Sequence, residues 1–132
     1  ISRFKQEKPA FLFGTDSFWE GVDIIGDALR LVVIMRLPFR VPTDPIIEAR
    51  SDYLEKREIN SFLNYSLPMA VIRFKQGFGR LIRARSDRGV VLVLDKRIVE
   101  KRYGKYFINS LPDCRKAYGN FKDMARELMD FI

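Results

Sequence analysis

Three short apolar runs constrain the fold of this chain more than any other feature. They are Ala10–Phe13 (AFLF), Leu31–Met35 (LVVIM) and Val90–Leu94 (VVLVL). Each run has four or five residues and lacks polar alternation. Gly14 ends the first run, the Leu37-Pro38 step stops the second, and Gly89 introduces the third. Runs of this kind are typical of strands that are buried on both faces of a parallel sheet, and their shortness disfavours a buried helix.

Helical patterns separate these runs. Thr43 and Asp44 precede Pro45, which is a helix-start signal, and the helix they predict runs to Tyr65 with a break near 57–60. We further expect a helix from Pro68 onward, a short helix at Tyr103–Ser110, a last strand at Cys114–Tyr118 and an amphipathic helix from Asn120.

Strands that alternate with helices predict one α/β domain over residues 1–132 with a largely parallel sheet. In such sheets ligands bind beyond the carboxyl ends of the strands. The loops expected to matter for function are therefore Gly14–Asp23, Pro38–Asp44 and Asp95–Arg102.

The charge balance points to a polyanionic partner. The formal net charge is +7, which favours nucleic acid or a nucleotide. The chain has no histidine and only Cys114, which excludes a histidine-dependent triad, an internal disulfide and a cysteine-based metal site. The apolar runs are too short to cross a membrane and no signal peptide is visible, so we expect a cytoplasmic protein without a membrane partner. The start at Ile1 predicts a fragment of a longer protein.

The stretch Lys75–Arg83 (KQGFGRLIR) gathers cations beside two glycines. Successive helical residues turn by about 100°. Arg73, Gln76, Arg80 and Arg83 therefore fall within an arc of roughly 80°. Guanidinium groups match phosphate oxygens, so this face is a candidate phosphate-binding row. The alternative is a surface helix whose arginines are only solvated.

A second informative stretch, Phe13–Ile24 (FGTDSFWEGVDI), follows the first apolar run. Its hydroxyls and small residues suit contacts to a phosphate backbone, and Glu20 and Asp23 are candidate partners for a ribose or for arginines. The plainer interpretation is a polar loop with Thr15 or Asp16 as a helix N-cap. Phe18 and Trp19 fit core packing better than base stacking.

The phosphate-binding pattern GxxxxGK[ST] is absent from the sequence. The chain thus offers arginines for phosphate without a site for the rest of a nucleotide. This asymmetry predicts one half of a two-part site and disfavours a self-sufficient nucleotide-binding enzyme.

Several separated blocks occur here in the order found in a known family. The blocks are GTDSFWEGVDIIGDAL, MRLPF with DPIIEAR, QGFGRLIR, and GVVLVLDKR with YGKYFINSLP. From about Ala10 to the end, the chain resembles the C-terminal motor domain of DinG-like helicases, which are superfamily 2 relatives of XPD. Phe13–Ile24 resembles helicase motif V, and Gln76–Arg83 resembles motif VI.

The resemblance implies the second of two RecA-like three-layer α/β domains, with the domain's first strand outside this chain. It implies an ATP-dependent DNA helicase, active in DNA repair, whose ATP and magnesium are held mainly by the first RecA-like domain. By motif position, Arg83 and Arg80 would be catalytic, and Gln76, Asp23, Glu20 and Gly21 would serve the nucleotide site. Gly14, Thr15, Ser17 and Trp19 would contact single-stranded or forked DNA. One cysteine cannot hold the iron–sulfur cluster of many members.

The isolated fragment is expected to be inactive, since the resemblance supplies only half of the motor. The alternative interpretation is a non-enzymatic basic α/β module that binds nucleic acid or protein.

Overall fold

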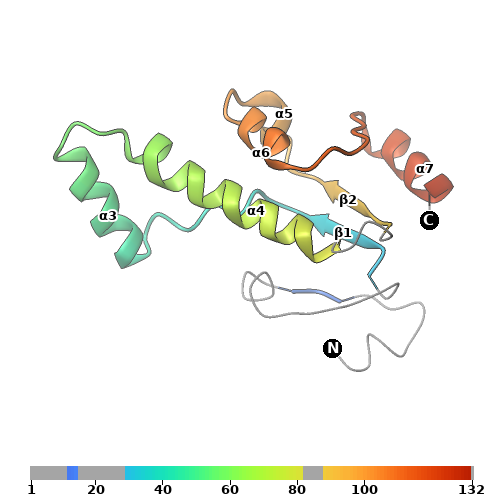
Figure 1. Ribbon diagram of the computed structural model, residues 1–132, viewed down its shortest axis with the longest axis horizontal. Helices are drawn as coiled ribbons and strands as arrows, with labels where there is room; N and C mark the ends of the chain where they lie inside the picture. Colours follow the sequence, from blue (N-terminus) through green and yellow to red (C-terminus); the bar gives the residue numbers. More distant parts are fainter. Residues whose placement is uncertain (1–11, 15–28, 82–87, 132) are drawn as a thin grey trace.

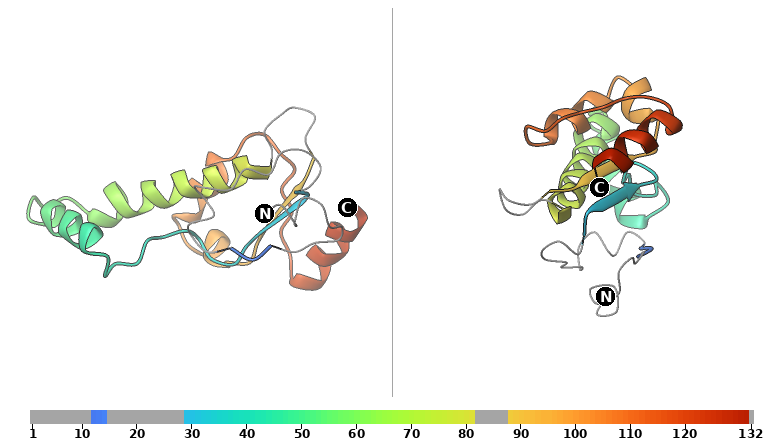
Figure 2. Two further views of the ribbon diagram at one scale, coloured as in Figure 1. Left: turned by 90° about the horizontal axis from the view of Figure 1, so that it is seen from below. Right: turned by 90° about the vertical axis from the view of Figure 1, so that its right-hand side faces the viewer.

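A computed structural model describes residues 12–14, 29–81 and 88–131 of the chain, without the side chains of Arg80 and Leu81. The two strands are β1 (Leu31–Ile34) and β2 (Val90–Val93). The helices are α3 (Pro45–Glu55), the π-helix η1 (Phe62–Ser66), α4 (Leu67–Leu81), α5 (Arg97–Glu100), α6 (Gly104–Ser110) and α7 (Phe121–Phe131). In Figures 1 and 2, α4 runs from α3 to the strands, and α3 and α7 lie at opposite ends of the molecule.

The two strands form a parallel pair, as expected for the second and third apolar runs. Their register sets Leu31 opposite Val90 and Ile34 opposite Val93. Parallel strands need a long crossover, which α3, η1 and α4 provide. The predicted α/β class with parallel strands is therefore confirmed.

Burial on both faces of the sheet was the wrong expectation for β1. α4 packs against both strands, and Ile34 is only 2% exposed. The side chain of Val33, which points to the other face because strand residues alternate, is 45% exposed. Val33 therefore departs from the burial on both faces that the apolar run predicts.

The core lies between α4, α6 and the carboxyl ends of the strands. Its members are apolar residues with almost no exposed surface: Ile34, Leu37, Leu67, Ala70, Phe74 and Phe107. The rings of Phe74 and Phe107 meet edge to face with centroids 5.4 Å apart, and both side chains are fully buried. Aromatic pairs of this geometry contribute about 0.5–1.5 kcal/mol beyond their buried area.

The helix-start signal before α3 is confirmed. The carboxylate of Asp44 accepts a hydrogen bond from the Ile46 backbone N–H at 3.0 Å, and Pro45 occupies the first turn. The helix ends at Glu55, and Glu58 adopts a φ of 59°, a left-handed value that interrupts the helix. The expected break near 57–60 is thus present, and the chain resumes as η1 and α4.

One predicted strand is not found, and another is described only in part. Cys114–Tyr118 is irregular and mostly exposed, because no strand of the described residues pairs with it. Leu12 and Phe13 also lie outside any strand, and Phe13 is 92% exposed; Ala10 and Phe11 lie outside the described residues. A short strand needs hydrogen-bonded neighbours for stability. Apolar residues alone did not supply them.

α5 and α6 meet at a contact that only glycine permits. A Cβ atom added to Gly104 would lie 1.9 Å from the carbonyl oxygen of Ile98. The Gly104 N–H also donates to the Lys101 carbonyl at 2.8 Å, which closes the turn between the two helices. Backbone atoms cannot rotate away as a flexible side chain can.

We expect Gly104→Ala to lower the free energy of unfolding by about 2–3 kcal/mol, at the upper end of the usual cost of overpacking. Gly79→Ala is the matched control, since no atom lies within 4 Å of its added Cβ. There alanine should stabilise the helix by about 0.5–1 kcal/mol. Urea denaturation of both variants measures the difference. Equal stability of the two variants would contradict the close approach at Gly104.

Candidate functional site

The described part of the arginine-rich motif lies on α4, as predicted. Phe74 anchors the helix in the core with 0% exposure, while Gln76 is exposed. Position 80 follows Gln76 by four residues, so both lie on one face of the helix. The backbone of Arg80 belongs to α4, its side chain is not described, and Arg83 lies outside the described residues.

Arg73 does not belong to the exposed row that the helical wheel predicted. Its side chain is buried, with 7% of the residue exposed. Ala70 and Gly77, both buried, flank it at helical spacing. Such small residues let neighbouring elements come close, which explains why Arg73 is covered. The exposed face therefore begins at Gln76.

Gly79 leaves the backbone of that face open. It is exposed, and no atom lies within 4 Å of the position where a Cβ would stand. Glycine inside a helix costs about 1 kcal/mol relative to alanine. Packing among the described residues does not require a glycine here, so the surface at Gln76–Gly79 leaves room for another molecule or domain to approach α4 closely.

The second motif lies almost entirely outside the described residues. Gly14 is described, exposed and outside any helix or strand. The remaining candidates of that motif are not described: Thr15, Ser17, Trp19, Glu20, Gly21 and Asp23. Their proximity to α4 stays a prediction.

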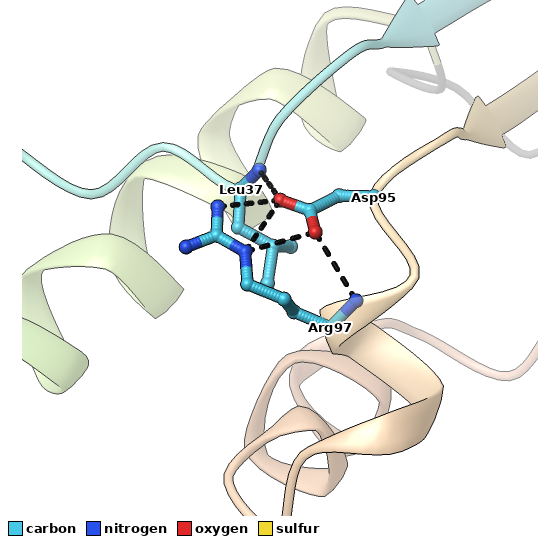
Figure 3. A network of polar contacts seen from close by, with 3 residues as sticks. All are labelled: Leu37, Asp95 and Arg97. Carbon is cyan, nitrogen blue, oxygen red and sulfur yellow. Dashed lines mark hydrogen bonds and ion pairs between the residues drawn. The ribbon is translucent and has the colours of Figure 1, made fainter.

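The structure instead shows a polar network where the two strands end. The Leu94 N–H donates to the Ile34 carbonyl at 2.9 Å, which continues the ladder past β2. The next residue, Asp95, is 8% exposed. One carboxylate oxygen accepts a hydrogen bond from the Leu37 N–H at 2.8 Å, across a separation of 58 residues. Figure 3 shows this carboxylate between the segment after β1 and the first turn of α5.

Arg97 completes the network. Its Nη2 lies 2.6 Å from one Asp95 oxygen, its Nε lies 2.9 Å from the other, and its backbone N–H donates at 3.1 Å. The guanidinium carbon also lies 5.6 Å from the centre of the Phe39 ring. The pair therefore holds the loop after β1 by a backbone hydrogen bond and by a ring contact. We call Asp95, Arg97 and the Leu37 N–H the strand-end clamp.

The clamp has a structural role, because the carboxylate of Asp95 is engaged by Arg97 and by the Leu37 N–H. Hydrogen bonds from Arg97, opposed by burial and helped by the Leu37 N–H, lower the pKa of Asp95 from 3.8 to about 2. A general base needs a pKa near the working pH. Sequence reasoning placed Asp95 in a loop of interest but missed this pairing. The only signal was the LDKR that follows an apolar run.

An aromatic cluster packs around Phe39, the ring that Arg97 of the clamp contacts. The Phe39 ring stacks on Phe62 at 5.8 Å and meets Tyr103 and Phe107 edge to face at 5.7 Å each. These residues come from the loop after β1, from η1 and from the α5–α6 region. Ring contacts from η1 and from the α5–α6 region therefore hold the loop beyond β1.

Neither a metal site nor a membrane segment is found in the described part of the chain. No group of three His, Cys, Asp or Glu residues there could hold a metal ion. None of its helices is both long enough and apolar enough to span a bilayer.

Comparison with known proteins identifies the family. A profile described as "Helicase C-terminal domain" matches residues 1–114. Together with the parallel pairing of β1 and β2, this match supports the predicted RecA-like α/β fold.

Relatives from several bacteria show the same relationship. The chain is 47% identical over 112 residues to a protein of Bacillus subtilis named 3'-5' exonuclease DinG, covering 85% of this chain and 12% of the relative. It is 46% identical over 116 residues to the ATP-dependent DNA helicase YoaA of Haemophilus influenzae, covering 88% and 18%. It is 44% identical over 126 residues to YoaA of Escherichia coli, covering 96% and 19%. The chain thus spans less than a fifth of the length of these relatives, and it belongs to the helicase C-terminal domain family as a DinG-like member.

Proposed function

We propose that this chain acts as the second motor domain of an ATP-dependent DNA helicase in its full-length protein. Two relatives named ATP-dependent DNA helicases support the proposal, at 46% and 44% identity. The observation that carries it furthest is the exposed, open face of α4 at Gln76 and Gly79. A half-site for phosphate needs such a face, directed toward a second domain.

In this proposal Arg83 and Arg80 bring positive charge to the γ-phosphate oxygens of ATP bound by the first RecA-like domain. ATP supplies the phosphoryl group whose transfer to water releases free energy. Phosphoryl transfer depends on positioning and on stabilised charge more than on covalent chemistry. Gln76 adds a polar contact from the same helix face. Magnesium ligands would come from the first domain.

The motif V segment would connect the nucleotide site with the strand of DNA. Glu20, Gly21 and Asp23 would lie on the nucleotide side, where the carboxylates pair with a ribose or with the motif VI arginines. Gly14, Thr15, Ser17 and Trp19 would contact single-stranded or forked DNA. Because both groups lie in one short segment, movement at the nucleotide side would shift the DNA contacts. We infer a cytoplasmic location, because the relatives are bacterial proteins and bacterial DNA lies in the cytoplasm.

A second candidate is a nucleic-acid-binding module without a motor role. The name of the Bacillus subtilis relative, an exonuclease, favours it. In that case the domain would hold a strand for a nuclease elsewhere in the protein, and ATP would not be hydrolysed.

The steady-state rate of ATP hydrolysis by the full-length protein separates the two candidates. For a motor, we expect hydrolysis that single-stranded DNA stimulates, together with ATP-dependent unwinding of a forked duplex. The 132-residue chain alone should bind DNA weakly and hydrolyse nothing. Full-length protein that binds DNA without hydrolysing ATP would overturn the motor and support the binding module.

A further inference from the structure

The two segments that follow the strands are unusually basic. Residues 35–44 and 94–105 contain seven of the 24 Lys and Arg residues of the chain and three of its 17 Asp and Glu residues. They therefore supply more than half of the net charge of +7 from a sixth of the length. Neither of the two motifs assigned above includes these cations.

The strand-end clamp joins the two segments that carry the first pair of cations, Arg36 and Lys96. The hydrogen bond from the Leu37 N–H to Asp95, at 2.8 Å, joins the two segments. Arg36 precedes Leu37 and Lys96 follows Asp95 in the chain. Leu37 and Asp95 are buried, whereas Arg36 and Lys96 are exposed. The contact that buries the inner residues thus turns their chain neighbours outward.

The aromatic cluster joins the same two segments next to a second pair of cations, Arg40 and Arg102. The rings of Phe39 and Tyr103 meet edge to face at 5.7 Å, and both residues are half-buried. Arg40 follows Phe39 and Arg102 precedes Tyr103, and both arginines are exposed. Two independent contacts therefore join the same segments, and each contact has an exposed cation beside it in the chain on both segments.

The nearby carboxylates neutralise this surface only in part. Asp95 is occupied by Arg97. Glu100 lies 3.6 Å from Lys96 and Asp44 lies 3.9 Å from Arg40. Both are exposed pairs four residues apart, which contribute little and are easily exchanged for another anion. Within the described residues, no ion pair involves Arg36 or Arg102.

We propose that Arg36, Arg40, Lys96 and Arg102, here called the strand-end surface, bind the phosphates of a single DNA strand. The inference rests on the proposed function, which supplies DNA as the ligand. Four cations spread over two segments suit a repeating phosphate backbone better than one isolated phosphate. The rings of the junction are occupied with one another, so base stacking is not available from them. The contact is therefore independent of DNA sequence.

Fluorescence anisotropy of the full-length protein with fluorescein-labelled oligo-dT tests this surface. An oligonucleotide of about 20 nucleotides covers more than one typical single-strand site. The test variant is Arg36→Gln/Arg102→Gln, and the affinity is measured between about 50 and 200 mM NaCl. The matched control is Lys122→Gln/Arg126→Gln, which removes two exposed cations from α7. Both variants lose the same net charge.

The expected result is weaker binding by the test variant with a shallower dependence on salt. Each lost phosphate contact on a single strand lowers the slope of log K against log salt by about 0.7, so two contacts lower it by roughly 1.4. The control should keep the slope of the wild type. An unchanged slope in the test variant, or an equal change in the control, would overturn the strand-end surface.

The outcomes separate this inference from the proposed function. If the wild-type protein binds oligo-dT and hydrolyses ATP, and the test variant binds oligo-dT equally well, the strand-end surface is overturned and the proposed motor function stands. If the wild-type protein binds no oligo-dT, both the strand-end surface and the proposed motor function are overturned. Thermal unfolding of the two variants should match the wild type, because all four substituted side chains are exposed. A test variant with weaker binding and a lowered midpoint would mean loss of fold and would count against the surface.

Discussion

Arg83→Ala in the full-length protein should reduce kcat for ATP hydrolysis by about 10³-fold or more, the range known for arginine fingers. The reason is electrostatic. Arg83 would bring a guanidinium group to the oxygens that carry charge in the transition state, and alanine has no donors in place of its fork. DNA affinity without nucleotide should stay close to that of the wild type.

Two further variants make the result specific. Arg83→Lys keeps the charge but loses the planar fork, so its rate should recover only in part. Arg126→Ala removes an exposed arginine on α7, outside the residues that the family profile matches, and should leave kcat unchanged. The assignment of Arg83 fails if Arg83→Ala hydrolyses ATP at a rate near that of the wild type. Single-turnover measurements would confirm that the chemical step is the one affected.

Asp95→Ala should lower the free energy of unfolding by about 2–3 kcal/mol. Removing one partner of a buried ion pair typically costs about 3–5 kcal/mol, and water around the partly exposed Arg97 reduces that cost. The variant leaves the Leu37 N–H and the Arg97 guanidinium without their acceptor. The midpoint of thermal unfolding should fall by roughly 10 °C. Asp113→Ala, at an exposed carboxylate, is the control and should shift the midpoint little.

The clamp also predicts how stability depends on pH. Its folded-state pKa of about 2 lies below the ordinary 3.8. As the pH falls, the unfolded chain therefore takes up the proton first. The contribution of Asp95 is fully present above about pH 5 and is lost as the pH falls from there through about 2, with a total of roughly 2 kcal/mol from the difference in pKa.

Asp95→Asn isolates that contribution, because an amide of the same shape does not titrate. Urea denaturation of this variant between about pH 5 and pH 2 should lack the Asp95 part of the acid-induced loss seen in the wild type. Identical pH profiles for the two proteins would show that the Asp95–Arg97 pair does not stabilise the fold.

Much of the secondary structure was predictable from local patterns. β1 and β2 match the second and third apolar runs within one residue at an end. The helix start at Pro45, the break before Asn60 and the long helix α4 follow from proline placement and hydrophobic spacing. These features depend on residues that are close in sequence, which is why the pattern alone predicts them.

The errors occurred where structure depends on distant partners. Asp95–Arg102 was expected to be a loop but contains α5, whose first residue, Arg97, pairs with Asp95, and Asp95 is itself fixed by the Leu37 N–H from 58 residues away. Cys114–Tyr118 has some strand character yet no neighbour to pair with among the described residues. Arg73 was placed on an exposed face and is buried. In each case a contact across the fold, or its absence, outweighed local propensity.

The sequence by itself determined the α/β class, the excess of basic residues and the motif residues by which the chain resembles its family. Those depend on residue types and short spacings. Only the tertiary structure decided that Gln76 and Gly79 leave an open face on α4, and that Asp95 joins two segments 58 residues apart. It also decided that Arg36 and Lys96 are exposed while their chain neighbours, Leu37 and Asp95, are joined and buried. Burial and hydrogen bonding between distant residues depend on how the strands pair and the helices pack, which no short stretch of sequence specifies.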